Sequence, residues 1–366
     1  MALETVASDG SSRRALTSTK RHAVSPESAP MPGPDGSWIV VSVEGTQSIL
    51  LRVQDGTPPL KINHLLPHAT LPSVDSVTGA IACVTQSATV PQEIEVLDAN
   101  GGSVWRSQHQ ESSTSSFARI SSIVSTDNVT IQSLALTSDR KPSGIILWPH
   151  GGPHSRTTEE YRPDIEAAVS HGFDVIQPNF RGSAGYGREF LLADRMDLAG
   201  GDYQDCLNVL EDWIAANGQQ DLPTFMTGTS YGGYLTAWAV GHTNRFSAAV
   251  AVNAVTNIES FYALTDIPGW VRWEFGGTPL TQRRLIHERS PVRYINKATT
   301  PTLVVHSAED RRVPITQGLE LHAALRDSGV ATSFIRYPRE YHRIVEPAHR
   351  MDLVARILNW FVTHAS

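Results

Sequence analysis

The segment around Ser230 constrains the fold more than any other part of the chain. An apolar run over residues 224–227 leads into Gly-Thr-Ser-Tyr-Gly at 228–232, and a helix-like stretch begins at Tyr234. Small residues on both sides of a serine let the backbone turn sharply from a strand into a helix, which exposes the hydroxyl at the end of the strand. This nucleophile-elbow pattern predicts a serine hydrolase built on an α/β sheet.

Two later residues complete a triad in the chain order of α/β hydrolases. Asp310 follows an apolar run over residues 302–306, and His342 follows the next run over residues 333–337. Loops at the carboxyl ends of parallel strands meet at one edge of a sheet, so an acid there can orient a histidine that activates the serine. We therefore predict Ser230 as the nucleophile, His342 as the base and Asp310 as the orienting acid.

Each residue of this triad also has an ordinary interpretation. A Gly-x-Ser-x-Gly pentapeptide occurs by chance, a loop aspartate is usually solvated, and a lone histidine is usually on the surface. Glu309 competes with Asp310, and His322 and His349 compete with His342. The chain order and the position of each residue after a strand favour the triad over coincidence.

The chemistry also requires backbone N–H donors for the oxyanion of the tetrahedral intermediate. The amide of Tyr231, directly after the serine, is one candidate. The other lies in His-Gly-Gly-Pro-His at 150–154, where we choose Gly152 as the donor and assign Gly151 to substrate binding. His150 and His154 have metal-ligand spacing, but the Gly-Gly-Pro between them prevents a helix, so we predict no metal site.

The chain divides into three predicted regions. Residues 1–34 are rich in Ser, Ala and Pro with few large apolar groups, which predicts a flexible tail. Residues 35–130 hold short β-branched runs separated by turn residues, which predicts an all-β segment. From residue 131 to 366 apolar runs alternate with helical patterns, which predicts a doubly wound, mostly parallel sheet of the α/β-hydrolase type. Asp202 is the predicted N-cap of one of its helices.

Composition excludes several other classes of protein. The net charge of −7 comes with no basic stripe, which argues against nucleic-acid binding. No stretch approaches about 18 consecutive apolar residues, and no hydrophobic run follows the basic residues near the N-terminus, so we expect neither a membrane span nor a signal peptide. Two cysteines are too few for a disulfide framework, which favours the cytoplasm. No pattern typical of a phosphate loop, dinucleotide site or metal cluster is present, so no cofactor is predicted.

From His150 to the C-terminus the chain resembles the prolyl oligopeptidase family of serine peptidases, and within it the acylaminoacyl-peptidase branch. The motifs that carry the resemblance lie, in order, at residues 150–154, 178–187, 200–205, 228–233, 265–270, 290–291 and 310–318. The resemblance implies the same roles for Ser230, Asp310 and His342, and it supports Gly152 and Tyr231 as oxyanion donors.

Members of that family carry a β-propeller before the hydrolase domain. Residues 34–38 look like the opening of a blade, and the strands up to about residue 130 resemble the last blades. A full propeller needs at least about four blades of four strands, so the expected all-β segment is a remnant. Its open edge must either be covered in some other way or be paired with a second copy, so a homo-oligomer through this edge is one of two expected solutions.

The chain also departs from the family pattern at the predicted base. Residues 339–342 read Arg-Glu-Tyr-His, where the family often has small residues. Glu340 there could form a charged hydrogen bond near the base, although a solvated loop glutamate is the commoner case. Arg181 could clamp a substrate carboxylate, but bracing its own loop is the favoured interpretation.

The resemblance and the motifs together imply an acyl hydrolase that forms an acyl-enzyme on Ser230. Acylated peptides are the first candidate substrates, by resemblance. The alternative is an esterase, thioesterase or acyl-cyclising enzyme that acts on a small-molecule acyl substrate, and a third reading is a catalytically silent interaction module. Phe261 and Trp270, within an insertion-like stretch at 253–288, are predicted to line the acyl pocket, with ordinary core packing equally favoured.

Overall fold

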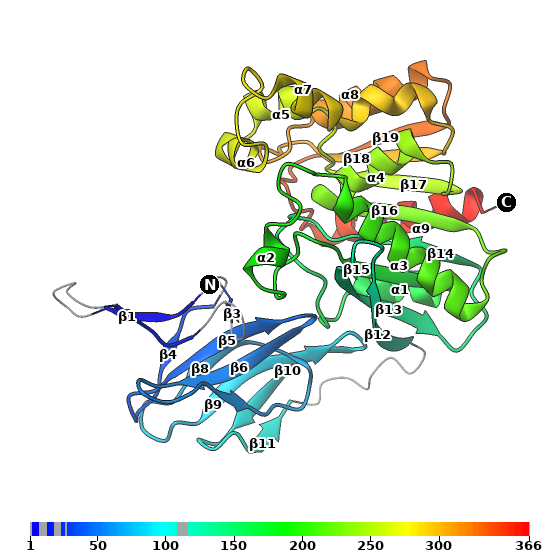
Figure 1. Cartoon of the computed structure of the whole chain (residues 1–366). Coiled ribbons are helices and arrows are strands. Elements are labelled where there is room, and N and C mark those ends of the chain that lie inside the picture. Colours follow the sequence, from blue (N-terminus) through cyan, green and yellow to red (C-terminus); the bar gives the residue numbers. More distant parts are fainter. Residues whose placement is uncertain (1, 7–12, 18–22, 26–27, 108–115, 366) are drawn as a thin grey trace. The chain divides into compact units, whose positions relative to one another are not determined.

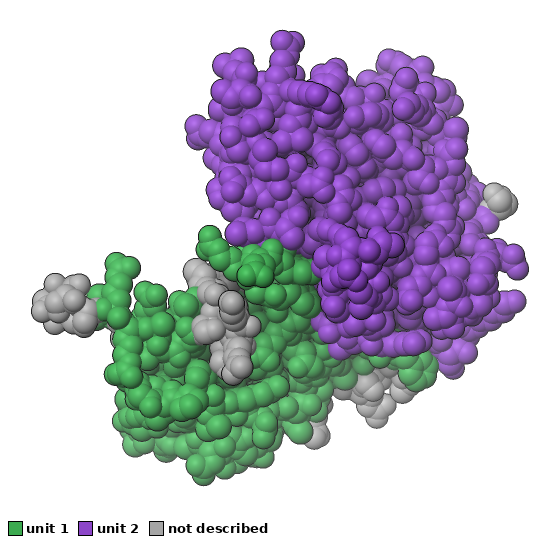
Figure 2. Space-filling model, in the orientation of Figure 1, with its two compact units in different colours: residues 1–118, 157–163, 183–191 green, residues 119–156, 164–182, 192–366 purple. Residues whose placement is uncertain are grey.

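A computed structural model describes residues 2–6, 13–17, 23–25, 28–107 and 116–365. Two units can be distinguished, and Figure 2 colours them separately. Unit 1 comprises residues 1–118, 157–163 and 183–191, and unit 2 comprises residues 119–156, 164–182 and 192–366.

Unit 2 is built on an eight-stranded sheet with the strand order β12-β13-β15-β14-β16-β17-β18-β19. All neighbours from β15 through β14 to β19 are parallel, and β13 is antiparallel to β15. The strands are β12 (Ser116–Val124), β13 (Thr130–Ser138), β14 (Gly144–Leu147), β15 (Phe173–Asn179), β16 (Thr224–Thr229), β17 (Ala248–Val252), β18 (Thr302–Ser307) and β19 (Thr332–Tyr337). This arrangement confirms the predicted α/β-hydrolase fold.

Helices follow most of the parallel strands. In unit 2 they are α1 (Pro163–Ser170), α3 (Gly201–Asn217), α4 (Tyr231–His242), α5 (Ile258–Leu264), α6 (Pro268–Glu274), α7 (Arg283–Glu288), the 3-10 helix η1 (Pro291–Lys297), α8 (Thr316–Asp327) and α9 (Pro347–Thr363). The short helix α2 (Arg188–Leu191) belongs to unit 1. Among the helices that the structure describes, none has both the length and the apolar character needed to cross a membrane.

The central strands are buried on both faces, as a doubly wound sheet requires. Every residue of β14, β15, β17 and β18 is buried. On one face Phe361 of α9 packs against Phe173 and Phe225, with ring centroids 6.4 and 4.7 Å away. In Figure 1, α9 lies behind the strands, while α3 and α4 lie in front of them. The sheet thereby holds its strand ends, and the loops on them, in fixed positions.

Unit 1 contains a nine-stranded sheet, with the main order β11-β10-β9-β8-β6-β5-β3, and a separate pair, β1-β2. Strands β8 to β11 form an antiparallel meander of the kind found in a propeller blade. The strands are β1 (Glu4–Val6), β2 (Arg13–Ala15), β3 (Ala23–Val24), β4 (Met31–Pro32), β5 (Trp38–Glu44), β6 (Gln47–Val53), β7 (Leu60–Ile62), β8 (His68–Val74), β9 (Ile81–Ser87), β10 (Val90–Leu97) and β11 (Ser103–Arg106).

The region predicted as a flexible tail contributes strands to this unit. Strands β3 and β4 pair with β5, and Val24 packs into a core cluster on one face of the β5–β6 hairpin together with partly buried Leu3 and Leu16. A few apolar residues suffice there because the hairpin presents a ready apolar face. Residues 1, 7–12, 18–22 and 26–27 of the predicted tail lie outside the described residues, and the flexibility of the tail stays a prediction.

The predicted boundary at residue 130 also differs from the observed arrangement. Strand β12, which the sequence analysis places in the all-β segment, joins the hydrolase sheet as its edge strand beside β13. The side chains of Phe117, Ile120 and Val124 on β12 are exposed. Pairing of a sheet edge with a second copy stays a prediction.

Candidate active site

Ser230 occupies a sharp turn between β16 and α4. Its backbone has φ 61° and ψ −115°, a conformation that a non-glycine residue adopts only under local constraint. A Cβ atom at Gly228 would lie 2.5 Å from the carbonyl carbon of Gly232, and one at Gly232 would lie 2.3 Å from the carbonyl oxygen of Pro149. The two glycines are therefore required by close backbone approach, which explains the Gly-x-Ser-x-Gly pattern.

The structure brings Ser230, His342 and Asp310 together. Nε2 of His342 lies 2.9 Å from Oγ of Ser230, and Nδ1 of His342 lies 2.7 Å from Oδ2 of Asp310. With Nδ1–H donating to the carboxylate, Nε2 is free to accept the serine proton. This is the hydrogen-bonded arrangement of nucleophile, base and acid that serine hydrolysis needs.

Asp310 is held rigidly by its own loop. Its Oδ1 accepts the backbone N–H groups of Arg312 and Val313, both at 2.9 Å, and its side chain is fully buried. Glu309, the alternative to Asp310 as the acid, is exposed. The ring of His322, an alternative to His342 as the base, contacts the hydroxyl of Thr332 at 3.3 Å. The geometry thus singles out Asp310 as the acid partner of His342.

Asn253 is a residue of the site that the sequence analysis missed. It follows β17, and its Nδ2 donates to the carbonyl oxygen of His342 at 3.0 Å and to Oγ of Ser307 at 3.1 Å. Its Oδ1 accepts the N–H of Ser307 at 2.8 Å. A polar residue shortly after an apolar run is the kind of signal that identified Asp310, and the position of Asn253 directly after the apolar run at 248–252 could have pointed to it.

Glu340 is buried, which corrects the prediction of a solvated glutamate. Its carboxylate accepts the N–H groups of Val345 and Glu346, each at 2.9 Å, and Nδ1 of His349 at 2.8 Å. Burial raises the pKa of Glu340, but these three donors outweigh it, so the net shift is downward. The charged group organises the chain that follows His342, and His349 is engaged there rather than at Ser230.

The loop at 150–154 places Gly151, rather than Gly152, against the elbow. A Cβ at Gly151 would lie 3.5 Å from Cβ of Ser230. Gly152 has φ 123°, and a Cβ there would collide with the backbone nitrogens of His154 and Ser155 at 2.6 and 2.5 Å. Local space therefore requires a glycine at 152, whereas a Cβ at Gly151 would make a close contact of 3.1 Å with the carbonyl oxygen of Thr229. The assignment of the second oxyanion donor to Gly152 stays a prediction.

His150, the first residue of this loop, holds the backbone of the loop in place through two contacts of its ring. Its ring stacks on Phe180 with centroids 4.3 Å apart, and its Nδ1–H donates to the carbonyl of Gly151 at 2.7 Å. Burial lowers the pKa of His150 to about 4, so the ring is neutral at physiological pH. A buried neutral histidine here braces the backbone next to Ser230.

Tyr231, the other predicted oxyanion donor, begins α4, where backbone N–H groups have no partner within the helix. Its hydroxyl donates to Oδ2 of Asp202, which also accepts the N–H of Ala199 at 3.2 Å. Burial raises the pKa of Asp202 to about 7. Asp202 is not the helix N-cap that the sequence predicts: Gly200 holds that position, because the carboxylate is engaged with Tyr231 and Ala199.

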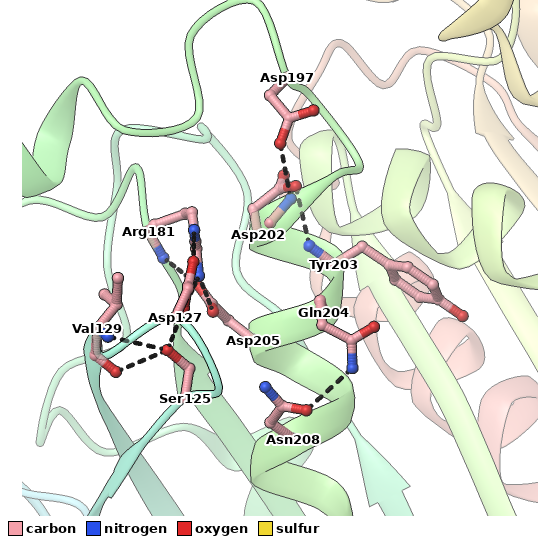
Figure 3. Close-up of polar contacts among 11 residues, drawn as sticks. Ser125, Asp127, Val129, Arg181, Asp197, Asp202, Tyr203, Gln204, Asp205 and Asn208 are labelled. Atoms are coloured by element: carbon pink, nitrogen blue, oxygen red, sulfur yellow. Dashed lines mark hydrogen bonds and ion pairs between the residues drawn. The ribbon is translucent and has the colours of Figure 1, made fainter.

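Arg181 braces its own loop, as the sequence analysis favoured. Its Nε and Nη2 donate to Asp205 at 2.8 and 2.7 Å, and its Nη1 donates to Asp127 at 2.6 Å (Figure 3). The guanidinium is therefore engaged on several sides by two carboxylates. A substrate carboxylate would have to displace one of them.

The two predicted pocket aromatics lie in the helical stretch after β17. Phe261 in α5 is 1% exposed, and Trp270 in α6 meets it edge to face with ring centroids 6.2 Å apart. The full burial of Phe261 indicates core packing for that ring. Trp270 is partly exposed, and its predicted role in substrate binding stays a prediction.

Comparison with known proteins places these features in a family. The model of the prolyl oligopeptidase family matches residues 160–366. The uncharacterized peptidase YuxL of Bacillus subtilis is 35% identical over 225 residues, which are 60% of this chain and 34% of that protein. The human acylamino-acid-releasing enzyme is 30% identical over 235 residues, 62% of this chain and 32% of that enzyme. The chain thus spans about a third of the length of these relatives.

Two solved structures share the fold over nearly the whole chain. The acylaminoacyl peptidase of Pyrococcus horikoshii superposes with a TM-score of 0.87 and 22% identity, covering 97% of this chain and 58% of that one. A puromycin-hydrolyzing peptidase of Mycobacterium tuberculosis gives a TM-score of 0.86 and 20% identity, covering 98% and 57%. At these identities the similarity establishes the fold alone.

Proposed function

The chain belongs to the prolyl oligopeptidase family, and from that premise we propose that it is a serine hydrolase that cleaves acyl bonds through an acyl-enzyme on Ser230. The observation that supports this most strongly is the pair of hydrogen bonds at His342, 2.9 Å to Ser230 and 2.7 Å to Asp310. The elbow geometry of Ser230 adds to it, because a strained backbone at this position exposes the hydroxyl.

In the first half of the reaction, Nε2 of His342 takes the proton of Ser230 as Oγ attacks the substrate carbonyl carbon. The carbonyl electrons move to oxygen, and the oxyanion accepts hydrogen bonds from backbone N–H groups, for which Tyr231 and Gly152 are the candidates. Asp310 stabilises the imidazolium. The imidazolium then returns its proton to the leaving group, the carbon–leaving-group bond breaks, and the acyl-enzyme remains.

In the second half, a water molecule replaces the leaving group. His342 takes a proton from the water, whose oxygen attacks the acyl carbon. The imidazolium then protonates Oγ of Ser230 as the acyl–serine bond breaks. The products are the free acid and the regenerated enzyme, so no oxidant, reductant or cofactor enters the balance.

We favour acylated peptides as the substrate class. The support is the name of the relatives of about 30% identity, which are acylamino-acid-releasing enzymes. A small-molecule ester, thioester or cyclisable acyl substrate is the second candidate.

Hydrolysis of N-acetyl-alanyl p-nitroanilide and of p-nitrophenyl esters of increasing chain length tests both the chemistry and the substrate class. We expect the anilide to be cleaved by the wild type and by His322→Ala, and neither substrate to be cleaved by Ser230→Ala or His342→Ala. Turnover of esters alone, still dependent on Ser230, would move the assignment to the small-molecule class. Turnover that survives Ser230→Ala would refute the proposed mechanism.

A further inference from the structure

Three ionisable side chains from separate segments meet at the end of the loop at 150–154. His154 closes that loop, Asp194 lies in the turn after α2, and Glu274 is the last residue of α6. Their potential ligand atoms all lie within 4.8 Å of one another. We propose that this His154 cluster is a binding site for a divalent transition metal, and that Zn²⁺ fits it best.

The two carboxylates lack other partners. Asp194 and Glu274 are both 0% exposed. Among the described residues, neither oxygen of either carboxylate has a hydrogen-bond partner, and neither does Nε2 of His154. Buried carboxylates are stable only when they are hydrogen-bonded, paired with a charge or bound to a metal. Because these unpartnered atoms lie within 4.8 Å of one another, a single bound metal would satisfy all of them.

The separations within the cluster match a metal better than direct contact. Nε2 of His154 lies 3.5 Å from Oδ1 of Asp194 and 3.5 Å from Oε1 of Glu274. These distances exceed the roughly 2.7 to 3.2 Å of a hydrogen bond. Ligand atoms held at about 2.1 Å from a tetrahedral Zn²⁺ lie about 3.4 Å apart, close to the observed values.

The types of ligand narrow the choice of metal. Mg²⁺ and Ca²⁺ prefer oxygen ligands alone, whereas imidazole favours zinc and its neighbours in the first transition row. The side chain of His154 is 26% exposed, so the cluster lies close to the surface of the protein. A Cβ at Gly182 would lie 2.5 Å from Oδ2 of Asp194, so the glycine makes the room that this carboxylate occupies.

A neighbouring arginine does not take the place of the metal. The guanidinium of Arg195 lies over the ring of Trp273, 5.0 Å from its centroid, and its Nε donates to the carbonyl of Trp273 at 2.8 Å.

Burial raises the pKa of Glu274 to about 8. Burial lowers the pKa of His154, but the two carboxylates outweigh it and the net shift is upward.

A second cluster in the same unit provides a matched control. Glu340, Glu346 and His349 also lie within ligand distance of one another. Here the carboxylate of Glu340 already accepts two backbone N–H groups and His349, and Glu346 accepts Nε and Nη2 of Arg339 at 2.9 and 2.8 Å. Because these oxygens are satisfied, we expect no metal at this second cluster.

The test uses the full chain, stripped with a chelator and then reloaded with Zn²⁺ or Co²⁺. Metal content after gel filtration should be one equivalent per chain, and the Co²⁺ form should show the visible bands of tetrahedral coordination. Glu274→Gln and Asp194→Asn keep the side-chain shape and should weaken binding by about 100-fold or more, since even supporting residues of metal sites change affinity by about 10- to 100-fold. Glu346→Gln should bind like the wild type.

Thermal unfolding gives a readout that does not depend on activity. Zn²⁺ should raise the midpoint of the wild type and of Glu346→Gln by several degrees and leave that of Glu274→Gln unchanged. Failure of the wild type to retain Zn²⁺ or to give the Co²⁺ bands would overturn the site, whatever the variants do. Equal binding by wild type and a folded Glu274→Gln or Asp194→Asn would overturn it as well. Neither result depends on Ser230, so the proposed hydrolase function is tested separately.

Discussion

The side-chain amide of Asn253 donates a hydrogen bond of 3.0 Å to the backbone carbonyl of His342. The same side chain is bonded at both ends to Ser307, the last residue of β18. Asn253 thereby links the end of β17 to the end of β18 and to the loop that carries His342. The 2.9 Å approach of His342 to Ser230 depends on where this loop is held.

Replacing Asn253 with alanine should impair catalysis more than stability. The loop of His342 loses its anchor, and misplacement of a catalytic group by about 1 Å can cost about 100-fold in rate. We expect kcat/KM to fall by roughly 10- to 100-fold. Steady-state kinetics with the best substrate from the panel above would measure this loss.

Asn257→Ala is a matched control for that experiment. Asn257 donates to Glu320 at 2.8 Å, close in sequence to Asn253 but without a contact to His342 among the described hydrogen bonds. Its loss should affect the unfolding midpoint while kcat/KM stays within about twofold of wild type. Equal kinetic losses in the two variants would mean that Asn253 has no special role in holding the base.

Asp310→Asn should abolish most of the turnover while leaving substrate binding intact. The amide cannot hold His342 with a proton on Nδ1, so Nε2 no longer accepts the proton of Ser230. In serine proteases the same change costs roughly 10⁴-fold in kcat. Kinetics at saturating substrate would measure it, with the exposed neighbour variant Glu309→Gln expected to match wild type. A loss for Glu309→Gln and not for Asp310→Asn would reverse the assignment of the acid.

Glu340→Gln should destabilise the chain segment after His342. The pKa of Glu340 is lowered, so the carboxylate is charged at neutral pH and its hydrogen bonds are charge-assisted. We expect a loss of about 2 kcal/mol in the free energy of unfolding at pH 7. Urea unfolding would measure it.

The pH dependence of that loss has a fixed sign. The pKa of Glu340 is lower in the folded state than the ordinary value of 4.5, so its carboxylate stabilises the folded state fully above pH 4.5. This stabilisation is lost as the pH falls through the pKa of the folded state. The difference between wild type and Glu340→Gln should therefore shrink at pH 4. Glu346→Gln removes one partner of an ion pair with the exposed side chain of Arg339, so it should destabilise the protein less than Glu340→Gln does at pH 7. A difference for Glu340→Gln that grows with acidity would contradict this account.

Acid should destabilise the protein through His150. The folded pKa is about 4 and the ordinary value is 6.5, so between these two pH values the unfolded state binds more protons than the folded state. Above pH 6.5 His150 causes no loss of stability. As the pH falls from 6.5 toward 4, protonation of His150 in the unfolded state lowers the free energy of unfolding by roughly 3 kcal/mol. Urea unfolding at a series of pH values would measure the slope.

His150→Asn keeps a donor for the carbonyl of Gly151 but cannot titrate. Its unfolding free energy should therefore vary less between pH 6.5 and 4 than that of wild type. His171→Asn, at an exposed position, should keep the wild-type slope. If all three proteins show the same slope, His150 does not titrate as the structure implies.

The sequence predicted the parts of this fold that depend on local patterns. The elbow at Ser230 was identifiable because two glycines must flank it, and the close contacts of Gly228 and Gly232 show why. Asp310 and His342 were identifiable because they follow the last two parallel strands in order. The meander in unit 1 was visible as short β-branched runs with turns between them.

Other features arise only from contacts between distant segments. Asn253 meets His342 across 89 positions, and Arg181 meets Asp127 across 54. The His154 cluster joins three segments that are far apart in the chain. From the sequence, His154 could be considered only as a pair with His150, and the Gly-Gly-Pro between the two argues against a metal site made by that pair. Burial of Glu340 could not be predicted, because the amide groups that stabilise its charge follow it in a loop without a regular pattern.

The triad at Ser230 is the central claim, and covalent labelling tests it most directly. The native protein would be treated with a fluorophosphonate probe, digested, and mapped by mass spectrometry, with His342→Ala and His322→Ala alongside. We expect a single adduct on Ser230 in wild type and His322→Ala, and a rate of labelling reduced by at least about 100-fold in His342→Ala. Absence of an adduct on Ser230 in folded wild-type protein, or labelling unaffected by His342→Ala, would contradict the account.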